Sequence, residues 1–250
     1  MWVMMSAPAE SALNQADGRP RREPSPHDRR ALYQLALLIA ILLLTLAVSI
    51  YSGQDLFIFG YIVVIVYVLR GPVHHNRPWQ ELGLKRGFVT DFKRVWYYFG
   101  IDALLFQVLP PTFGVAFVLG YYPELLRHIT GRLSISFGSL EGLSAVGGLL
   151  AAALILTLME EVVFRVTIQE RLSWFIGTLP AILFASVIFG LAHVVGTSGS
   201  LPVVLTDIAG VAIDGVFFGI IYAKTHNLAL TWATHYTADV VGLIALVLIF

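Results

Sequence analysis

Two adjacent carboxylates and an arginine lie at the end of a long apolar run, in the stretch EEVVFR at residues 160–165. Side chains four residues apart share one face of an α-helix, so Glu161 and Arg165 are predicted to form an ion pair. Successive side chains of a helix point about 100° apart. Glu160 is therefore expected to face a different neighbour, which leaves its carboxylate free for a different role.

Two histidines further along the chain are candidates to work with that carboxylate. His193 closes the stretch FGLAH, in which Gly190 and Ala192 would let a neighbouring helix approach closely. His235 and Asp239 are four residues apart in HYTAD, a spacing suited to holding one ion or one water molecule between them. Two histidines with a carboxylate also suit a zinc ion.

The elements that must position these residues are predicted to be membrane helices. The chain has 250 residues, of which 57% are hydrophobic and 13% charged, and its mean hydropathy is +0.78. Soluble domains carry about 25% charged residues, so the composition predicts an integral membrane protein. The formal net charge of zero argues against nucleic acid as a partner. The lack of cysteine excludes disulfides, thiol nucleophiles and thiolate metal ligands.

The hydropathy pattern predicts an all-α fold, a polytopic transmembrane helical bundle. About 20 apolar residues cross a bilayer as a helix, and the chain accommodates about 7–8 membrane helices of that kind. Pro110 and Pro111 interrupt the third apolar run, which is either one kinked span or two short helices. The predicted helices cover residues 31–51, 55–70, 95–126, 142–172, 178–195, 202–223 and 228–250.

Residues 1–30 differ from the rest of the chain, since they are polar, contain proline and lack periodicity, which predicts a disordered tail. They also lack the apolar core of a signal peptide, so the first apolar run is expected to remain as a membrane span. The arginines of this tail predict a cytoplasmic N-terminus for a multi-pass protein. Residues 31–250 are predicted to form one transmembrane domain, with the candidate chemistry in 142–250. The topology of the second half stays open.

Helix geometry predicts that Glu160 and His193 can meet. The turn between their two helices is expected near Gly177 to Pro180. At 1.5 Å of rise per residue, both side chains lie roughly 20–25 Å from that turn. They would therefore face each other across an antiparallel helix pair. His235 is expected nearer the middle of its own helix, so that helix tilt would have to close the remaining gap.

The three motifs resemble those of a known family. EEVVFR is similar to the EExxxR motif of the CPBP family, the intramembrane proteases that include the type II CAAX prenyl endopeptidases and the Abi proteins. FGLAH (189–193) matches its FxxxH motif and HYTAD (235–239) its HxxxN/D motif, in the order of the family. Each motif is short, and their common order makes the resemblance specific. Asp239 occupies a motif position at which asparagine is commoner in the family. Residues 1–140 support the resemblance only through their hydropathy.

The resemblance implies an endopeptidase in which Glu160 activates a water molecule for attack on a peptide carbonyl. His193 and His235 would bind a divalent metal, for which zinc is the best candidate, or would stabilise the oxyanion, with Asp239 assisting. A second mechanism stays open, in which the glutamate activates water and the histidines donate hydrogen bonds without a metal.

The resemblance also implies a role for the remaining charged residues of the first motif, and it implies partners. Glu161 and Arg165 would be the supporting pair, which agrees with their shared helix face. The partners would be the lipid bilayer and a membrane-associated protein or a prenylated peptide. Processing of the CAAX tails of prenylated proteins is an activity that this resemblance would allow.

Other functions fit parts of the same pattern. A catalytically silent immunity or scaffolding protein of the same fold would use the polar cluster to hold helices together, and a transporter would need a longer polar pathway. The stretch GTSG at 196–199 spells the GxSG of serine intramembrane proteases, with His235 as its base, but it leaves residues 160–165 unexplained. The chain has neither HExxH nor GxGD. Asp207 and Asp214 are assigned no chemistry.

Overall fold

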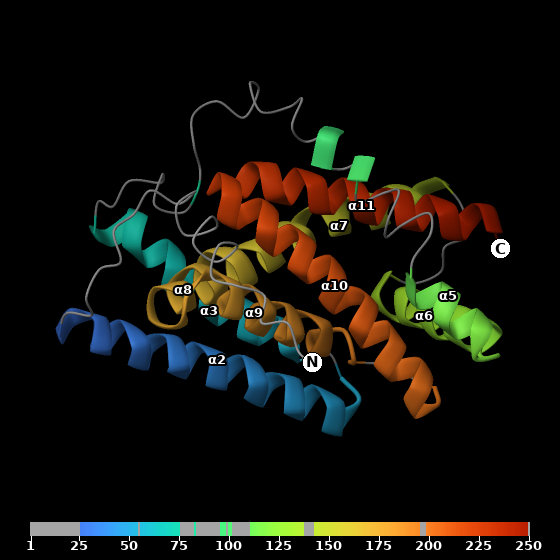
Figure 1. The fold of residues 1–250 in the computed structure, drawn as a ribbon, viewed down its shortest axis with the longest axis horizontal. Coiled ribbons are helices and arrows are strands. Elements are labelled where there is room, and N and C mark those ends of the chain that lie inside the picture. The colour runs from blue at the N-terminus through green and yellow to red at the C-terminus, as the bar shows by residue number, and fades with distance from the viewer. Residues whose placement is uncertain are drawn as a thin grey trace, which may run out of the picture.

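The structure of the protein, a computed structural model, describes residues 26–54, 56–75, 83, 96–98, 100–101, 111–137, 143–195 and 199–249. Every regular element in these ranges is helical, which confirms the predicted all-α class for them (Figure 1). The elements are α2 (Pro26–Ser52), α3 (Phe57–His75), α5 (Pro111–Val118), α6 (Tyr122–Phe137), α7 (Leu143–Glu160), η3 (Glu161–Gln169), α8 (Glu170–Ile176), α9 (Thr178–Ala192), α10 (Leu201–Thr225) and α11 (Leu228–Ile249).

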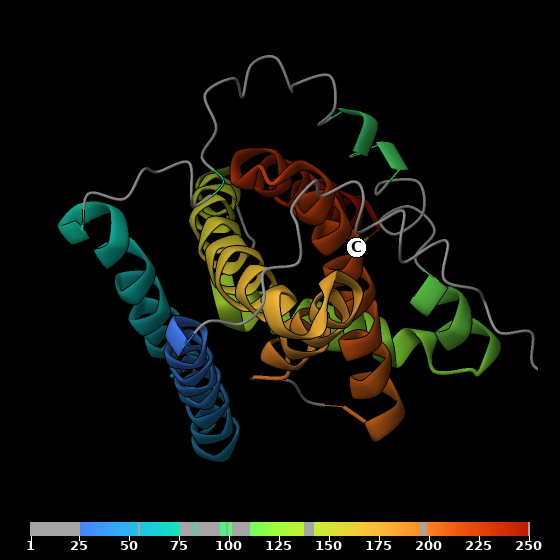
Figure 2. The same cartoon turned by 60° about the vertical axis from the view of Figure 1, so that its left-hand side comes forward.

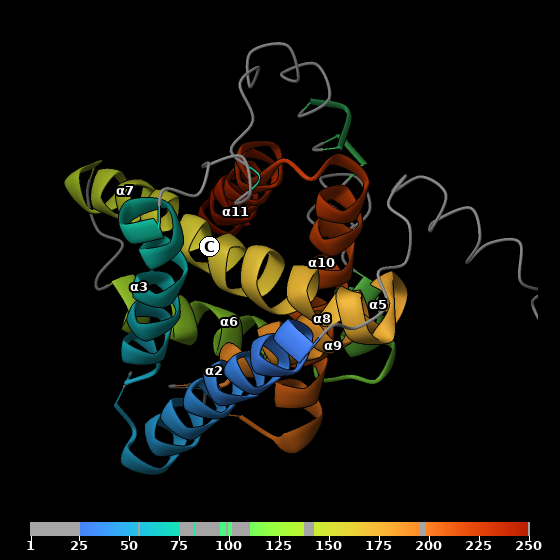
Figure 3. The same cartoon turned by 90° about the vertical axis from the view of Figure 1, so that its left-hand side faces the viewer.

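Helices α2 and α3 lie side by side at one flank of the bundle (Figure 2). A leucine stripe of α2, which includes Leu35, Leu38 and Leu42, is buried at the three- and four-residue spacing of one helix face. Glycine allows the two helices to approach, because a Cβ on Gly60 would lie 2.5 Å from the Thr45 hydroxyl oxygen. Figure 3 looks onto this flank.

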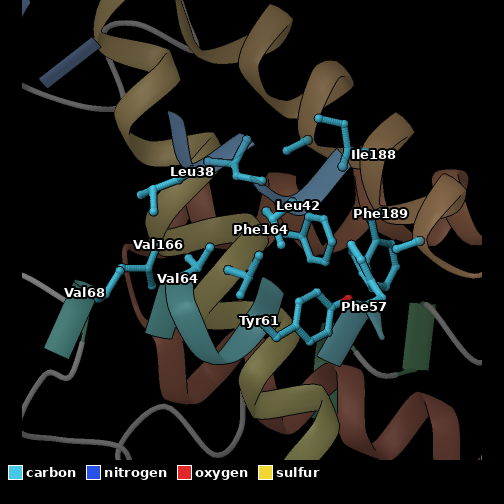
Figure 4. Close-up of a cluster of buried hydrophobic side chains, with 14 of the residues drawn as sticks. Leu38, Leu42, Phe57, Tyr61, Val64, Val68, Phe164, Val166, Ile188 and Phe189 are labelled. Atoms are coloured by element: carbon cyan, nitrogen blue, oxygen red, sulfur yellow. The ribbon is translucent and has the colours of Figure 1, made fainter. Parts of the chain in front are cut away.

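The main hydrophobic core lies between this helix pair and the segment that carries the first motif (Figure 4). Phe164 of η3 is fully buried there and packs edge-on against Tyr61 of α3 and against Phe189 of α9. Val166 and Ile188 belong to the same cluster. The N-terminal helices therefore support the motif through apolar packing.

Elements α7, η3 and α8 form one continuous helix whose middle part is a π-helix. The residues flanking η3 have ordinary helical angles, with φ −62° and ψ −46° at Glu160 and φ −59° and ψ −49° at Glu170. The amide of Glu170 donates to the Arg165 carbonyl, and the Thr167 hydroxyl donates to the Val162 carbonyl at 2.8 Å, both across five residues. π-Helical segments are rare and occur frequently at functional sites. Here the segment begins inside the first motif.

The observed helix boundaries differ from the predicted ones most clearly in two stretches. The helix predicted at 142–172 continues to Ile176 and ends at Gly177, whose φ of 88° suits glycine. The stretch predicted as 95–126 is not one span, because α5 begins at Pro111 and a turn at Leu119 and Gly120 separates it from α6. Proline at the first helical position favours this start, since the missing amide costs no hydrogen bond.

Several sequence features lie outside the described residues. They are the tail up to residue 25, most of the basic loop after α3, residues 102–110 with Pro110, and residues 196–198 of the GxSG stretch. Helix α2 already begins at Pro26, ahead of the start expected at residue 31.

Two stretches in the described part of the chain are long and apolar enough to cross a bilayer, Ala31–Ser52 and Leu201–Thr225. Phe57–Arg70 and Thr178–Ala192 are shorter apolar helices. By length and composition alone, these four stretches are compatible with the predicted membrane protein.

Glycines bring α9 and α10 into close contact, as the small residues of FGLAH predict. A Cβ on Gly190 would lie 2.6 Å from the Ile208 carbonyl oxygen, and one on Gly215 would lie 3.0 Å from the Phe189 ring. This packing holds α9, which carries His193, against α10.

We expect Gly190→Ala to lower the stability of the protein, because the new methyl group meets backbone that cannot move freely. Overpacking of this kind costs about 1–3 kcal/mol. The control is Gly147→Ala in α7, where a Cβ would meet nothing within 4 Å. Thermal unfolding in detergent should show a lower melting temperature for Gly190→Ala alone. Equal melting temperatures for both variants would contradict the close packing.

Candidate active site

Glu160, the last residue of α7, lies between two histidines from different helices. Its Oε1 is 3.8 Å from Nε2 of His193, and its Oε2 is 3.7 Å from Nε2 of His235. The side chain is 15% exposed, so it is largely enclosed but remains open to a small molecule. The structure thus brings together three side chains that are far apart in the sequence. Glu160 and His193 meet across the helix pair that turns at Gly177, and His235 joins them from α11.

His193 lies at the C-terminus of α9, where its backbone leaves the helix with φ −86° and ψ 2°. Its Nδ1 is 2.8 Å from the carbonyl oxygen of Phe189. A carbonyl oxygen only accepts, so Nδ1 carries the proton and donates it to this bond. In the neutral ring, Nε2 then keeps a free lone pair on the side of Glu160.

His235 on α11 has its two ring nitrogens committed to different carboxylates. Nδ1 is 2.8 Å from Oε1 of Glu161, while Nε2 is 3.7 Å from both Glu160 and Oδ1 of Asp239. If the Glu161 carboxylate is ionised it can only accept, so Nδ1 donates to it and the tautomer matches that of His193. The His235 side chain is 4% exposed, whereas that of Asp239 is 41% exposed. Asp239 therefore lies at the open edge of the cluster.

The predicted ion pair between Glu161 and Arg165 is present and fully buried. Arg165 Nε lies 3.4 Å from Glu161 Oε2, and neither side chain is exposed. The guanidinium carbon lies over the ring of Phe189 at 5.0 Å and over that of Phe218 at 5.9 Å. The guanidinium nitrogens have no hydrogen-bond partner in the described part of the chain. Aromatic faces attract cations at such distances. This attraction offsets part of the free-energy cost of burying guanidinium nitrogens that make no hydrogen bond.

The carboxylates of this cluster outnumber its permanently positive side chain. Three carboxylates, those of Glu160, Glu161 and Asp239, stand against one guanidinium, that of Arg165. Largely buried charges require partners. Protons on the imidazoles or a divalent cation would supply the missing positive charge, and His193 and His235 can hold either one through Nε2.

The donor chemistry fits a zinc ion, because two imidazole Nε2 atoms and a carboxylate face one another and each Nδ1 is oriented by an acceptor. No group of three or more His, Asp or Glu side chains is already gathered closely enough to hold an ion among the described residues. A bound metal therefore stays a prediction.

Three features of the cluster were not predicted. The bond from His235 to Glu161 links α11 to η3, and we identify no sequence signal that connects these two residues. The Phe218 ring stacks on the His235 imidazole with centroids 4.4 Å apart and an interplanar angle of 23°. Nothing in the sequence singles out Phe218 among the 16 phenylalanines. The π-helix carries no sequence signal that we can identify.

One of the two aspartates that were assigned no chemistry pairs outside this cluster. Asp207 of α10 pairs with His128 of α6, with Oδ2 and Nε2 at 3.1 Å, and both side chains are buried. Tyr121, which directly precedes α6, and Thr206 of α10 lie close through their hydroxyl oxygens, 2.7 Å apart. These contacts fix α6 onto α10.

Comparison with known proteins identifies one matching family. Residues 142–241, about two fifths of the chain, match the family described as type II CAAX prenyl endopeptidase Rce1-like. The matched range contains α7, η3, α8, α9, α10 and all three motifs. No curated protein and no solved structure is significantly similar to the chain.

Proposed function

From the premise that residues 142–241 form a domain of the Rce1-like type II CAAX prenyl endopeptidase family, we propose that this protein is an intramembrane endopeptidase. In this proposal Glu160 is the general base that activates the attacking water molecule. The observation that carries it is the position of the Glu160 carboxylate, within 3.8 Å of Nε2 of both His193 and His235. A group that only held helices together would not need a partly open carboxylate between two imidazoles.

The proposed reaction needs one base and one stabilising site. Glu160 takes a proton from water, the hydroxide adds to the peptide carbonyl carbon, and the carbonyl oxygen becomes an oxyanion. The C–N bond then breaks, Glu160 returns the proton to the leaving amine, and the products are a carboxylic acid and an amine. His193 and His235, when protonated at Nε2, can donate to the oxyanion. Asp239 assists through His235, and Glu161 with Arg165 supports the cluster.

A divalent metal, with zinc preferred, is part of the proposal, and His193 and His235 would hold it through Nε2. Such an ion supplies a Lewis acid that polarises the carbonyl and acidifies water. In either case Nδ1 of each histidine is held by an acceptor, so Nε2 is the nitrogen that would meet the ion or the oxyanion.

Elemental analysis of the purified protein tests the metal. We expect a near-stoichiometric divalent metal in the wild type and its loss in both His193→Ala and His235→Ala. The control is His226→Asn, because His226 pairs with Glu170 at 3.4 Å and has φ 44°, which asparagine tolerates. A metal-free wild type that still cleaves peptide in the presence of chelator would contradict the proposed metal. Glu160 would then be the sole activator of water.

The membrane part of the proposal rests on the exposed faces of the helices. In α2 and α3 the outward residues are as apolar as the buried ones, with Leu37, Leu44, Phe59 and Val66 all exposed. A helix that is apolar all round belongs in a core or in lipid. We therefore propose an integral, multi-pass protein with about 7–8 membrane helices in residues 31–250. The proposed tail, residues 1–30, lies on the cytoplasmic side.

The substrate class proposed from the family is a membrane-associated protein or a prenylated peptide with a CAAX tail. The experiment is cleavage of a farnesylated CAAX peptide and of a transmembrane peptide library by protein in lipid nanodiscs, with Glu160→Gln as the inactive variant. Cleavage by the wild type alone supports the endopeptidase. Folded wild type that cleaves neither would favour the catalytically silent immunity or scaffolding protein.

A further inference from the structure

We propose that Phe218 is a positioning residue of the active site, which fixes the plane of the His235 imidazole so that Nε2 faces Glu160. The inference rests on the proposed function for its kinetic consequence. Phe218 lies on α10, outside the three sequence motifs, and its side chain is buried. Its ring is nearly parallel to the His235 ring, with centroids 4.4 Å apart and 23° between the planes.

One hydrogen bond is not enough to orient an imidazole. The bond from Nδ1 of His235 to Glu161 holds one ring atom, but the ring could still turn about its Cβ–Cγ bond whenever this single hydrogen bond stretches or breaks. A pivot would carry Nε2 away from Glu160 and Asp239, each now 3.7 Å away. The stacked Phe218 ring opposes this motion on one face. Phe189 meets the imidazole edge-on, at 5.7 Å and 81°, and limits it from another direction.

Phe218 also closes a circuit of contacts with the buried ion pair. His235 bonds to Glu161, Glu161 pairs with Arg165, and the Arg165 guanidinium lies over the Phe218 ring, which stacks on His235. Aromatic stacking and cation–π contacts each stabilise a pair of side chains beyond the burial of apolar surface. The circuit joins η3, α10 and α11, so it ties the histidine to the helix that carries the base.

Kinetics of Phe218→Leu test the proposal. The leucine keeps an apolar side chain but removes the flat face, and misplacement of a catalytic group can cost about 100-fold in rate. We expect kcat to fall about 10- to 100-fold with KM nearly unchanged. Phe218→Tyr retains the ring and should restore most of kcat. If Phe218→Leu does not fold, the variant Phe218→Met, which fills the space with a flexible side chain, is measured in its place.

The matched control is Phe217→Leu, the same change one residue earlier on α10. The Phe217 and Phe218 rings are neighbours, with centroids 6.1 Å apart, and Phe218 is the one whose ring stacks on His235. Phe217→Leu should leave kcat close to that of the wild type. An equal loss of kcat in both leucine variants, or none in Phe218→Leu, overturns the proposal.

NMR of the labelled histidine rings gives a readout that does not depend on activity. We expect sharp His235 ring signals in the wild type, Phe217→Leu and Phe218→Tyr, and exchange broadening in Phe218→Leu. Sharp signals in Phe218→Leu overturn the positioning role even if cleavage is slow. Inactive wild type would contradict the proposed function, while broadening confined to Phe218→Leu would still support the positioning of His235.

Discussion

Replacing Glu160 by glutamine is expected to reduce peptide cleavage roughly 10²- to 10⁴-fold, the usual contribution of a general base. Glutamine has nearly the same shape as glutamate and can still accept or donate hydrogen bonds near the two histidines. It cannot take a proton from water. The loss should therefore appear in kcat, with the melting temperature of the protein close to that of the wild type.

The control for this variant is Glu170→Gln. Glu170 lies at the other end of the π-helix, and its side chain is 16% exposed, close to the 15% of Glu160. It pairs with His226 rather than with the cluster. Initial rates on the farnesylated peptide should be unchanged in Glu170→Gln. A folded Glu160→Gln protein that keeps a tenth or more of the wild-type rate would rule out Glu160 as the base.

Arg165→Met is expected to cost about 3–5 kcal/mol of stability, the loss found when one partner of a buried ion pair is removed. Both side chains of the pair are fully buried, so Glu161 would be left as a buried charge with only His235 beside it. Methionine fills much of the same space between Phe189 and Phe218. The loss should therefore reflect charge more than packing. Equilibrium unfolding in mixed detergent micelles measures it.

The double variant Glu161→Gln with Arg165→Met separates these two causes. It removes both charges at once, and the glutamine oxygen can still accept from Nδ1 of His235. Removal of both partners of a buried pair is often close to neutral, so most of the stability should return. A double variant as unstable as Arg165→Met would show that the packing of the guanidinium against the two rings dominates.

Patterns in short stretches of the sequence predicted the features of the fold that depend on interactions within one helix or one helix pair. The helix ranges follow from apolar runs, the pairing of Glu161 with Arg165 follows from the four-residue spacing, and the turn expected near Gly177 to Pro180 lies at Gly177, between α8 and α9. The meeting of Glu160 with His193 also followed from counting residues on either side of one turn. Each of these inferences uses residues within one helix or one helix pair.

The remaining features depend on contacts between helices that a single sequence does not connect. The bond of His235 to Glu161 and the stacking of Phe218 on His235 require the relative rotation of η3, α10 and α11. Apolar helices carry little periodicity to fix that rotation, since lipid and core accept the same side chains. For the same reason the π-helix was not predicted, because its five-residue bonds are favoured only once its neighbours are in place.

The long separation between Glu161 and its partner on α11 has a consequence for biosynthesis. His235 follows Glu161 by 74 residues, which a ribosome adding about 5–20 residues per second needs roughly 4–15 s to make. In the membrane protein proposed above, Arg165 would be the partner of Glu161 during that interval. It would spare Glu161 from entering lipid as a lone charge, which costs about 2.5–3.5 kcal/mol. The nascent helix could thus be inserted before its tertiary partners exist. Because the cluster is complete only after α11 arrives, the proposed endopeptidase would stay inactive toward neighbouring membrane proteins until its own assembly ends.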